Sequence, residues 1–162
     1  MSTVALQACG IRARGIDINA QMIAAGRKVL GVDLIVSDIS SIEGKHRIIT
    51  ASSVLEHVHD AVGFLKMLRA KTEYLVITVP NVLDIAYVER GTSPSIQMNW
   101  GHVWYFEEST LECALNLAGF RVIEFFRPSF SLPGVLGNAM RFIQQYLRID
   151  ANLYGGIGCL AN

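Results

Sequence analysis

Short apolar runs alternate with amphipathic segments along the first half of the chain. The runs that predict buried strands are Arg14–Ile18, Val32–Val36, Arg47–Ala51 and Tyr74–Val79. Between these runs, apolar residues recur at helical spacing, and Asn19 and Gly31 are suited to begin and end the helix predicted for 20–29. Strands that alternate with helices form parallel sheets with helices on both faces. The pattern therefore predicts a doubly wound, mostly parallel α/β fold.

The alternation breaks after Asn81. Residues 82–104 form a long irregular stretch, and loops of this length in a compact domain usually serve a function. Beyond it the pattern predicts a helix that ends at Gly119, a strand over 120–126, a second helix over 135–149 and a last strand over 155–160. The second half is thus expected to add strands to the same sheet and helices that pack on it.

Composition and charge argue against several classes of function. The chain has 162 residues, 51% of them hydrophobic and 17% charged, with a formal net charge of zero. It can bury a sizeable core, but it lacks the basic face that nucleic-acid binding requires. The three cysteines show no CxxC pair and no Cys/His spacing of a metal site, which predicts buried thiols in a reducing cytoplasm and no metal. The first residues lack the basic region and long apolar run of a signal peptide, so we expect none. No apolar run reaches the roughly 18 residues of a transmembrane helix.

Polar residues follow the predicted strands, where ligands bind in open α/β sheets. They are Asp17, Ser37 and Asp38, Ser52 and Ser53, and Pro80 and Asn81. A carboxylate at Asp17 can accept two hydrogen bonds from a ribose diol. Asp38 can accept from the exocyclic amine of an adenine, with Ile18 and Ile39 packing against the base. Each acid also suits a helix N-cap, so both interpretations stay open.

Several segments, in this order, resemble the class I S-adenosylmethionine-dependent methyltransferases, in particular the small-molecule branch of methyltransferase types 11, 12 and 23. They are Gly15-Ile16-Asp17, Asp38, Leu55-Glu56-His57-Val58 with Asp60, Val79-Pro80-Asn81, Gly101-His102-Val103 and a helix that closes on Ala118-Gly119-Phe120. The resemblance covers about 5–126. It implies a Rossmann-like fold, S-adenosylmethionine as cofactor and a small-molecule acceptor.

The resemblance also implies roles for the polar strand ends. Asp17 would bind the ribose hydroxyls and Asp38 the adenine amine. Ser52, Ser53 and Val54 would lie along the methionine part of the cofactor.

Two histidines are the candidate catalytic residues. His57 would take a proton from the acceptor, because its side chain titrates near neutral pH. His102 would act as an acid or base on the acceptor side, within a loop that closes over the acceptor. Alternatively, Glu56 and His57 cap the following helix and order the loop, and His102 is a packed histidine in an aromatic cluster.

The chain departs from the family pattern at its start. Family members begin with a strand and a Gly-x-Gly turn, whereas residues 3–13 already correspond to the helix after that turn. We therefore expect an N-terminally truncated domain, 1–162, that lacks the first strand and the glycine-rich turn. Residues 1–81 would be the remnant of the cofactor half, and 82–162 would supply the acceptor-side loop, the helices and the last strands.

The missing strand belongs between the strands that end at Asp17 and Ser52. Three outcomes are open. The neighbouring strands can close up; a second copy, a partner chain or the C-terminal segment can fill the place; or the chain can be a fragment of a longer protein. Gly155–Gly158 matches the last antiparallel strand of the family instead of a cofactor turn.

The expected function is methyl transfer from S-adenosylmethionine to a small molecule, impaired by the missing turn. The alternatives are an inactive scaffold or dimerisation domain and, ranked last, a nicotinamide dinucleotide-binding domain. The third alternative does not explain Glu56-His57 or Gly101-His102.

Overall fold

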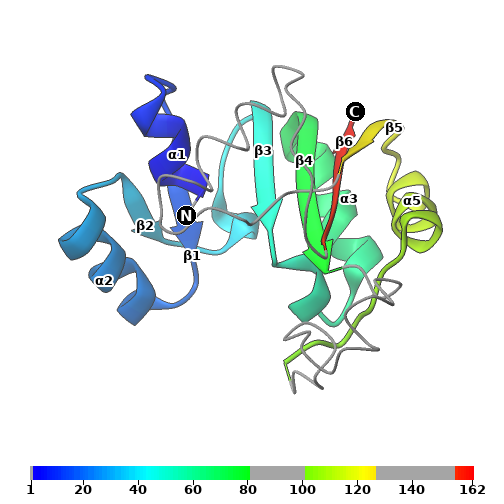
Figure 1. The fold of residues 1–162 in the computed structure, drawn as a ribbon, viewed down its shortest axis with the longest axis horizontal. Coiled ribbons are helices and arrows are strands. Elements are labelled where there is room, and N and C mark those ends of the chain that lie inside the picture. Colours follow the sequence, from blue (N-terminus) through cyan, green and yellow to red (C-terminus); the bar gives the residue numbers. More distant parts are fainter. Residues whose placement is uncertain (1, 81–100, 127–155) are drawn as a thin grey trace. The chain divides into compact units, whose positions relative to one another are not determined.

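The computed structural model describes residues 2–80, 101–126 and 156–162 (Figure 1). These residues fall into two compact units, an N-terminal unit of residues 2–44 and a C-terminal unit of the remaining described residues. Most of the predicted irregular stretch 82–104 and the predicted helix 135–149 lie outside the described residues. Among the helices that are described, none is long and apolar enough to cross a membrane.

The N-terminal unit contains two helices, a 3-10 turn and a two-stranded parallel sheet. Its elements are α1 (Ser2–Ala8), β1 (Gly15–Asp17), α2 (Ala20–Leu30), β2 (Leu34–Val36) and the turn η1 (Ile39–Ser41). The predicted caps of α2 are confirmed, because the Asn19 side chain accepts from two backbone N–H groups and Gly31 adopts a left-handed conformation with φ 61°. β1 and β2 pair from Gly15↔Leu34 to Asp17↔Val36, so both strands end at the same edge.

The C-terminal unit is a four-stranded mixed sheet with two helices. Its elements are β3 (His46–Ser52), the 3-10 turn η2 (Leu55–His57), α3 (Ala61–Lys71), β4 (Thr72–Pro80), α5 (Glu108–Leu117), β5 (Val122–Phe126) and β6 (Gly156–Ala161). The strand order is β3-β4-β6-β5. β3 runs parallel to β4, and β6 runs antiparallel to both of its neighbours.

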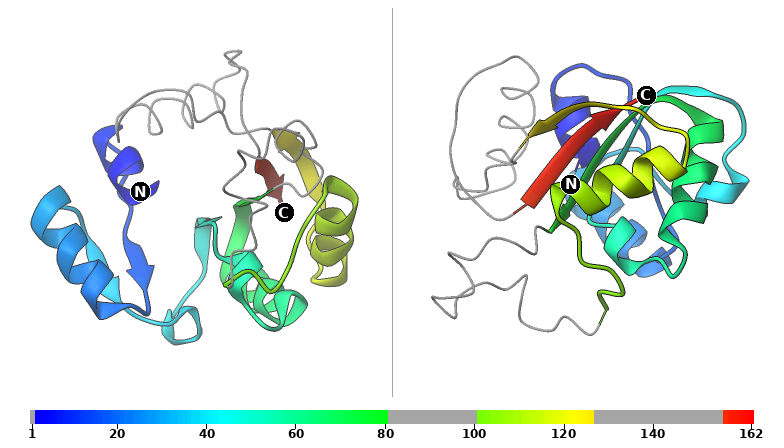
Figure 2. Two further views of the ribbon diagram at one scale, coloured as in Figure 1. Left: turned by 60° about the horizontal axis from the view of Figure 1, so that its bottom comes forward. Right: turned by 90° about the vertical axis from the view of Figure 1, so that its right-hand side faces the viewer.

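The core of this unit lies between the sheet and the helices. α3 packs against β4, α5 packs against β5, and the two helices contact each other (Figure 2). The largest buried apolar side chains come from η2, α3, β4, α5 and β6: Leu55, Leu65, Leu68, Leu75, Ile77, Leu111, Leu115 and Cys159. Burial of this apolar surface is the main force that holds β3 and β4 in register and fixes the loops at their ends.

The strand pairings bear on the missing strand. Among the described strands, β1 pairs only with β2, and β3 pairs only with β4. β6 runs antiparallel to its neighbours, as the resemblance implied for the last strand. It lies between β4 and β5, so the C-terminal segment does not take the place of the missing strand.

The expectation for the cysteines is wrong at two positions. Cys9 and Cys113 are exposed, and Cys159 alone of the three is buried. Cys9 follows the last residue of α1, and Cys113 lies on the exposed side of α5, where an isolated small side chain costs little.

Candidate functional site

The carboxyl edge of the β1–β2 sheet carries Asp17 and Asp38. Asp17 is the exposed last residue of β1, and one of its carboxylate oxygens accepts from the backbone N–H of Asn19 at 2.8 Å. Its carbonyl accepts from Ser37 N–H at 3.0 Å, which ties the end of β1 to the end of β2. The sequence placed both acids at neighbouring strand ends, and the parallel pairing confirms that placement.

Asp38 shows the N-cap arrangement that the sequence left open. Its side chain accepts from the backbone N–H of Ser40 at 2.7 Å and begins η1. Hydrogen bonds from Ser40 lower the pKa of Asp38, since they stabilise the ionised carboxylate. Asp17 is not a helix cap, because Asn19 caps α2.

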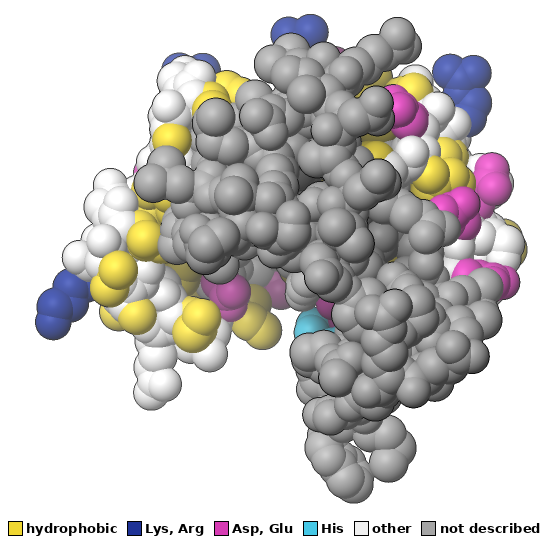
Figure 3. Space-filling model, viewed as in Figure 1, with side chains coloured by type: hydrophobic (Ala, Val, Ile, Leu, Met, Phe, Trp, Pro, Cys, Tyr) yellow, Lys and Arg dark blue, Asp and Glu magenta, His cyan; other side chains and the backbone are white. Residues whose placement is uncertain are grey.

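An apolar residue follows each of these acids. Ile18 is 75% exposed, an uncommon degree for a large aliphatic side chain, and Ile39 is partly buried. Hydrophobic side chains at the molecular surface are visible in the space-filling view (Figure 3). A carboxylate beside an exposed aliphatic side chain fits a ligand with both a hydroxyl-bearing part and a flat apolar part.

The end of β3 in the C-terminal unit has an unusual backbone. Ser53 adopts φ 52°, and it is the one described residue other than glycine with a positive φ. Its N–H donates to Thr78 O at 3.0 Å, and the hydroxyls of Ser52 and Thr78 lie 2.8 Å apart. A serine with a left-handed backbone is uncommon in proteins, and residues of this kind cluster at functional sites. Ser52, Ser53 and Val54 are all exposed, so their polar and backbone groups are accessible to a ligand.

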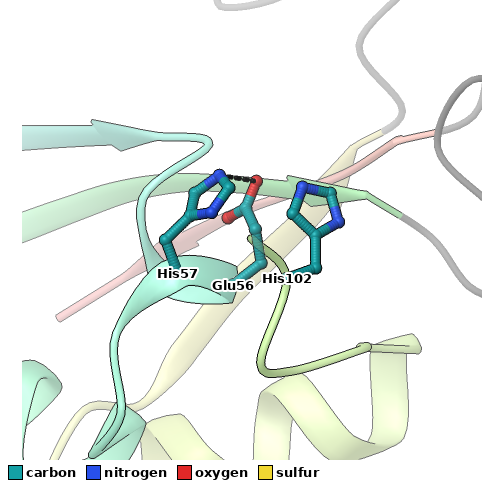
Figure 4. Close-up of side chains that lie close together, drawn as sticks. All are labelled: Glu56, His57 and His102. Atoms are coloured by element: carbon teal, nitrogen blue, oxygen red, sulfur yellow. Dashed lines mark ion pairs between the residues drawn. The ribbon is translucent and has the colours of Figure 1, made fainter. Parts of the chain in front are cut away.

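The structure brings His57 and His102 together. Their ring centroids lie 4.7 Å apart in an edge-to-face arrangement, although the two residues are far apart in the sequence. Glu56 lies beside them, with its Oε1 at 4.0 Å from His57 Nε2 (Figure 4). The sequence named both histidines but did not predict their contact or the part played by Glu56.

Backbone hydrogen bonds hold the two segments against each other. Val103 and Trp104 both donate their N–H to Glu56 O, at 2.8 and 3.3 Å. The indole Nε1 of Trp104 donates to Val58 O at 2.8 Å, and His57 Nδ1 bonds to Gly101 O at 2.7 Å. Four hydrogen bonds therefore fix His102 beside η2.

Glu56 is the most unusual side chain of this cluster. It is 1% exposed, and neither of its carboxylate oxygens has a hydrogen-bond partner among the described residues. Burial raises the pKa of Glu56, and the backbone N–H of Glu56 and the nearby His57 oppose that rise. Burial also lowers the pKa of His102, as does its proximity to His57, so the His102 imidazole is neutral at pH 7.

The residues around the cluster are apolar and accessible. Val103, Trp104 and Tyr105 are each between 42% and 49% exposed, and the Tyr105 ring stands edge-on to His102 at 6.1 Å. His59 is exposed and does not join the cluster, and Asn81 lies outside the described residues. The arrangement offers acid–base groups beside a surface that suits a small organic molecule.

The chain matches the family model described as a methyltransferase domain over residues 2–125. It belongs to this methyltransferase family. That match confirms the resemblance carried by the motifs, and it covers both described units up to β5. No curated protein matches the chain.

Solved structures confirm the Rossmann-like methyltransferase fold. Magnesium protoporphyrin IX methyltransferase from Synechocystis PCC 6803, solved with S-adenosylhomocysteine, matches with TM-score 0.60 and 16% identity over 98% of this chain and 67% of that chain. An S-adenosylmethionine-dependent methyltransferase from Archaeoglobus fulgidus gives 0.62 and 20%, over 96% and 78%. The complex between the Haloferax volcanii Trm112 methyltransferase activator and its partner protein gives 0.66 and 12%, over 97% and 75%. The chain thus spans between 67% and 78% of the length of these proteins.

Proposed function

We propose that the chain transfers a methyl group from S-adenosylmethionine to a small-molecule acceptor. The observation that carries the proposal is the exposed Asp17 carboxylate at the carboxyl end of β1, followed directly by the exposed Ile18. In an open α/β sheet this edge is the ligand side, and a carboxylate there suits a ribose diol. Membership of the methyltransferase family makes S-adenosylmethionine the ligand with both chemical parts.

Each cofactor-binding residue has a proposed contact. Asp17 accepts hydrogen bonds from the two ribose hydroxyls, and Asp38 accepts from the adenine amine. Ile18 and Ile39 pack on the adenine ring. The methionine part is assigned to Ser52, Ser53 and Val54, for which the left-handed Ser53 and the exposed hydroxyls are the support. When bound, the cofactor supplies a methyl group on a positively charged sulfur.

The proposed acceptor lies near His57 and His102. His57 Nδ1 faces a carbonyl, which only accepts, so Nδ1 donates to it and Nε2 is the ring nitrogen left for the acceptor. The lowered pKa of His102 favours its neutral imidazole. An imidazole nitrogen can take a proton from an acceptor hydroxyl or amine. Val103, Trp104 and Tyr105 offer apolar contact to such a molecule.

An inactive scaffold that joins a partner chain or a second copy is the alternative. It is favoured by the single-sided pairing of β1 and of β3 among the described strands, since a free strand edge accepts another strand. The two proposals differ in a measurable way, because only the first requires the cofactor to bind.

Calorimetric titration with S-adenosylhomocysteine tests the proposal. We expect the chain to bind, and we expect Asp17→Ala to weaken binding more than tenfold, because hydrogen bonds to a charged group contribute about 1.5–3 kcal/mol each. Asp33→Ala is the matched control, since Asp33 is an exposed acid just before β2 and makes a surface ion pair with Arg14. Absence of binding at millimolar ligand would contradict methyl transfer and favour the scaffold. Preferential binding of NAD would favour the dinucleotide-binding alternative.

A further inference from the structure

The buried Glu56 carboxylate is not explained by folding alone. It is 1% exposed, both of its oxygens are buried, and His57 Nε2 at 4.0 Å is too far for a hydrogen bond. Buried charges in proteins are as a rule paired, hydrogen-bonded or coordinated to a metal. Among the described residues, neither carboxylate oxygen of Glu56 has a hydrogen-bond donor, and its ion pair with His57 is long.

His57 is oriented as metal-binding histidines are. Its Nδ1–H donates to Gly101 O at 2.7 Å, and its Nε2 faces the Glu56 carboxylate. A metal-bound imidazole nearly always donates its other ring N–H to a carbonyl or carboxylate in this way.

His102 completes a group of three metal-ligand side chains. One ligand atom from each of Glu56, His57 and His102 lies within 4.8 Å of the other two. The carboxylate of Glu56 stands between the two imidazole rings in the close-up view (Figure 4). The hydrogen bonds of Val103 and Trp104 to Glu56 O keep the backbone of these residues in place, so the side chains are held close before any ligand arrives.

We propose that Glu56, His57 and His102 bind one divalent transition-metal ion of the zinc class. Two imidazoles and one carboxylate are a ligand set of catalytic zinc sites, whereas Mg²⁺ and Ca²⁺ prefer oxygen ligands. Bonds of about 2.0–2.2 Å in a tetrahedral site place ligand atoms roughly 3.4 Å apart. The three side chains therefore move together by about 1 Å on binding, which small side-chain rotations achieve.

Three protein ligands leave a fourth position open for an oxygen of the acceptor. A metal there would lower the pKa of a bound hydroxyl, whose proton would pass to water near neutral pH. This role rests on the proposed methyl transfer, whereas metal binding itself does not. With the metal bound, His57 and His102 would act as metal ligands in place of the proton acceptors proposed above.

The experiment is a titration of the chelator-treated full chain with Co²⁺, followed by visible absorption, and with Zn²⁺, followed by calorimetry. We expect one equivalent of metal to bind. We expect Glu56→Gln and His102→Gln each to weaken binding at least about tenfold, by analogy with the effect of altered metal-site residues. His59→Gln is the matched control, because His59 is exposed two residues after His57 and stands outside the cluster.

Three results would contradict the metal site. Equal loss in His59→Gln, unchanged binding in Glu56→Gln, or no binding by the unaltered chain would overturn the metal site. Glu56→Gln has nearly the shape of the natural residue, so a folding defect is not expected, and circular dichroism checks it. Titration of the same variant with S-adenosylhomocysteine tests the methyltransferase proposal independently, because Glu56 is not among the proposed cofactor contacts.

Discussion

Replacement of Glu56 by glutamine is expected to stabilise the metal-free protein. The side chain is 1% exposed and its carboxylate has no hydrogen-bond donor among the described residues. An unsatisfied buried polar group costs about 1–3 kcal/mol, and more when it is charged. Glutamine keeps the shape and removes the charge but still leaves a polar amide unpaired. We therefore expect a gain of about 1–2 kcal/mol in the free energy of unfolding at pH 8.

The effect has a definite pH dependence. Burial raises the pKa of Glu56 above its ordinary value of 4.5, so the folded protein binds this proton more tightly than the unfolded chain. The stability that this proton contributes is fully present below about pH 4.5, and it is lost as pH rises through the folded pKa. Glutamine has no such loss. The two proteins should therefore converge in acid and diverge toward pH 8, with His57 and His102 as the titratable groups that face Glu56.

Urea unfolding in the presence of a chelator, followed by tryptophan fluorescence, measures this difference. Trp104 is a suitable probe because its indole is bonded to Val58 O beside the cluster. Glu43→Gln is the control, since Glu43 is exposed and its replacement should change stability by less than about 0.5 kcal/mol. A Glu56→Gln variant less stable than the unaltered protein at pH 8 would show that the carboxylate has a stabilising partner.

Two further predictions concern local structure. Asn19→Ala should lower the free energy of unfolding by about 1 kcal/mol, because two backbone N–H groups of α2 lose their acceptor. Urea unfolding measures this free energy, and an unchanged value would contradict the capping role of Asn19. Burial, with a contribution from the nearby Glu112, raises the pKa of Cys159 to about 12, so a thiol reagent at pH 8 should modify only Cys9 and Cys113 until urea is added. Immediate reaction of all three thiols would refute that assignment.

Local patterns were sufficient to predict most of the described elements. The caps of α2 depend on Asn19 and Gly31 alone, and both are confirmed. Boundaries that depend on hydrogen bonds across a turn were less accurate. The strand predicted over 120–126 is β5, and it begins at Val122 and not at Phe120. The reason is that Phe120 N–H still bonds to Leu115 O and Gly119 takes φ 84°. The first helix ends at Ala8, whereas the resemblance extended it over residues 3–13.

The candidate site was only partly predictable. Asp17 and Asp38 lie at strand ends, and the parallel order of strands places such residues without further information. The contact of His57 with His102 depends instead on hydrogen bonds between two segments far apart in the sequence. Spacing rules for metal ligands detect close pairs along the chain, so they miss a set that the fold assembles from η2 and the segment before α5. The adjacency of Glu56 to His57 was the one available signal.

The stability of the Glu56→Gln variant also distinguishes a metal ligand from a simple acid or base. Without metal the substitution is expected to stabilise the protein by about 1–2 kcal/mol. A metal present at a hundred times its Kd stabilises the protein that binds it by about 2.7 kcal/mol, whereas a variant with tenfold weaker binding gains about 1.4 kcal/mol at the same concentration. The stability advantage of the variant should therefore shrink by about 1.3 kcal/mol or more when Zn²⁺ replaces the chelator. A Glu56 that served only as a proton-transfer group or helix-ordering residue would leave the stability difference the same in both conditions.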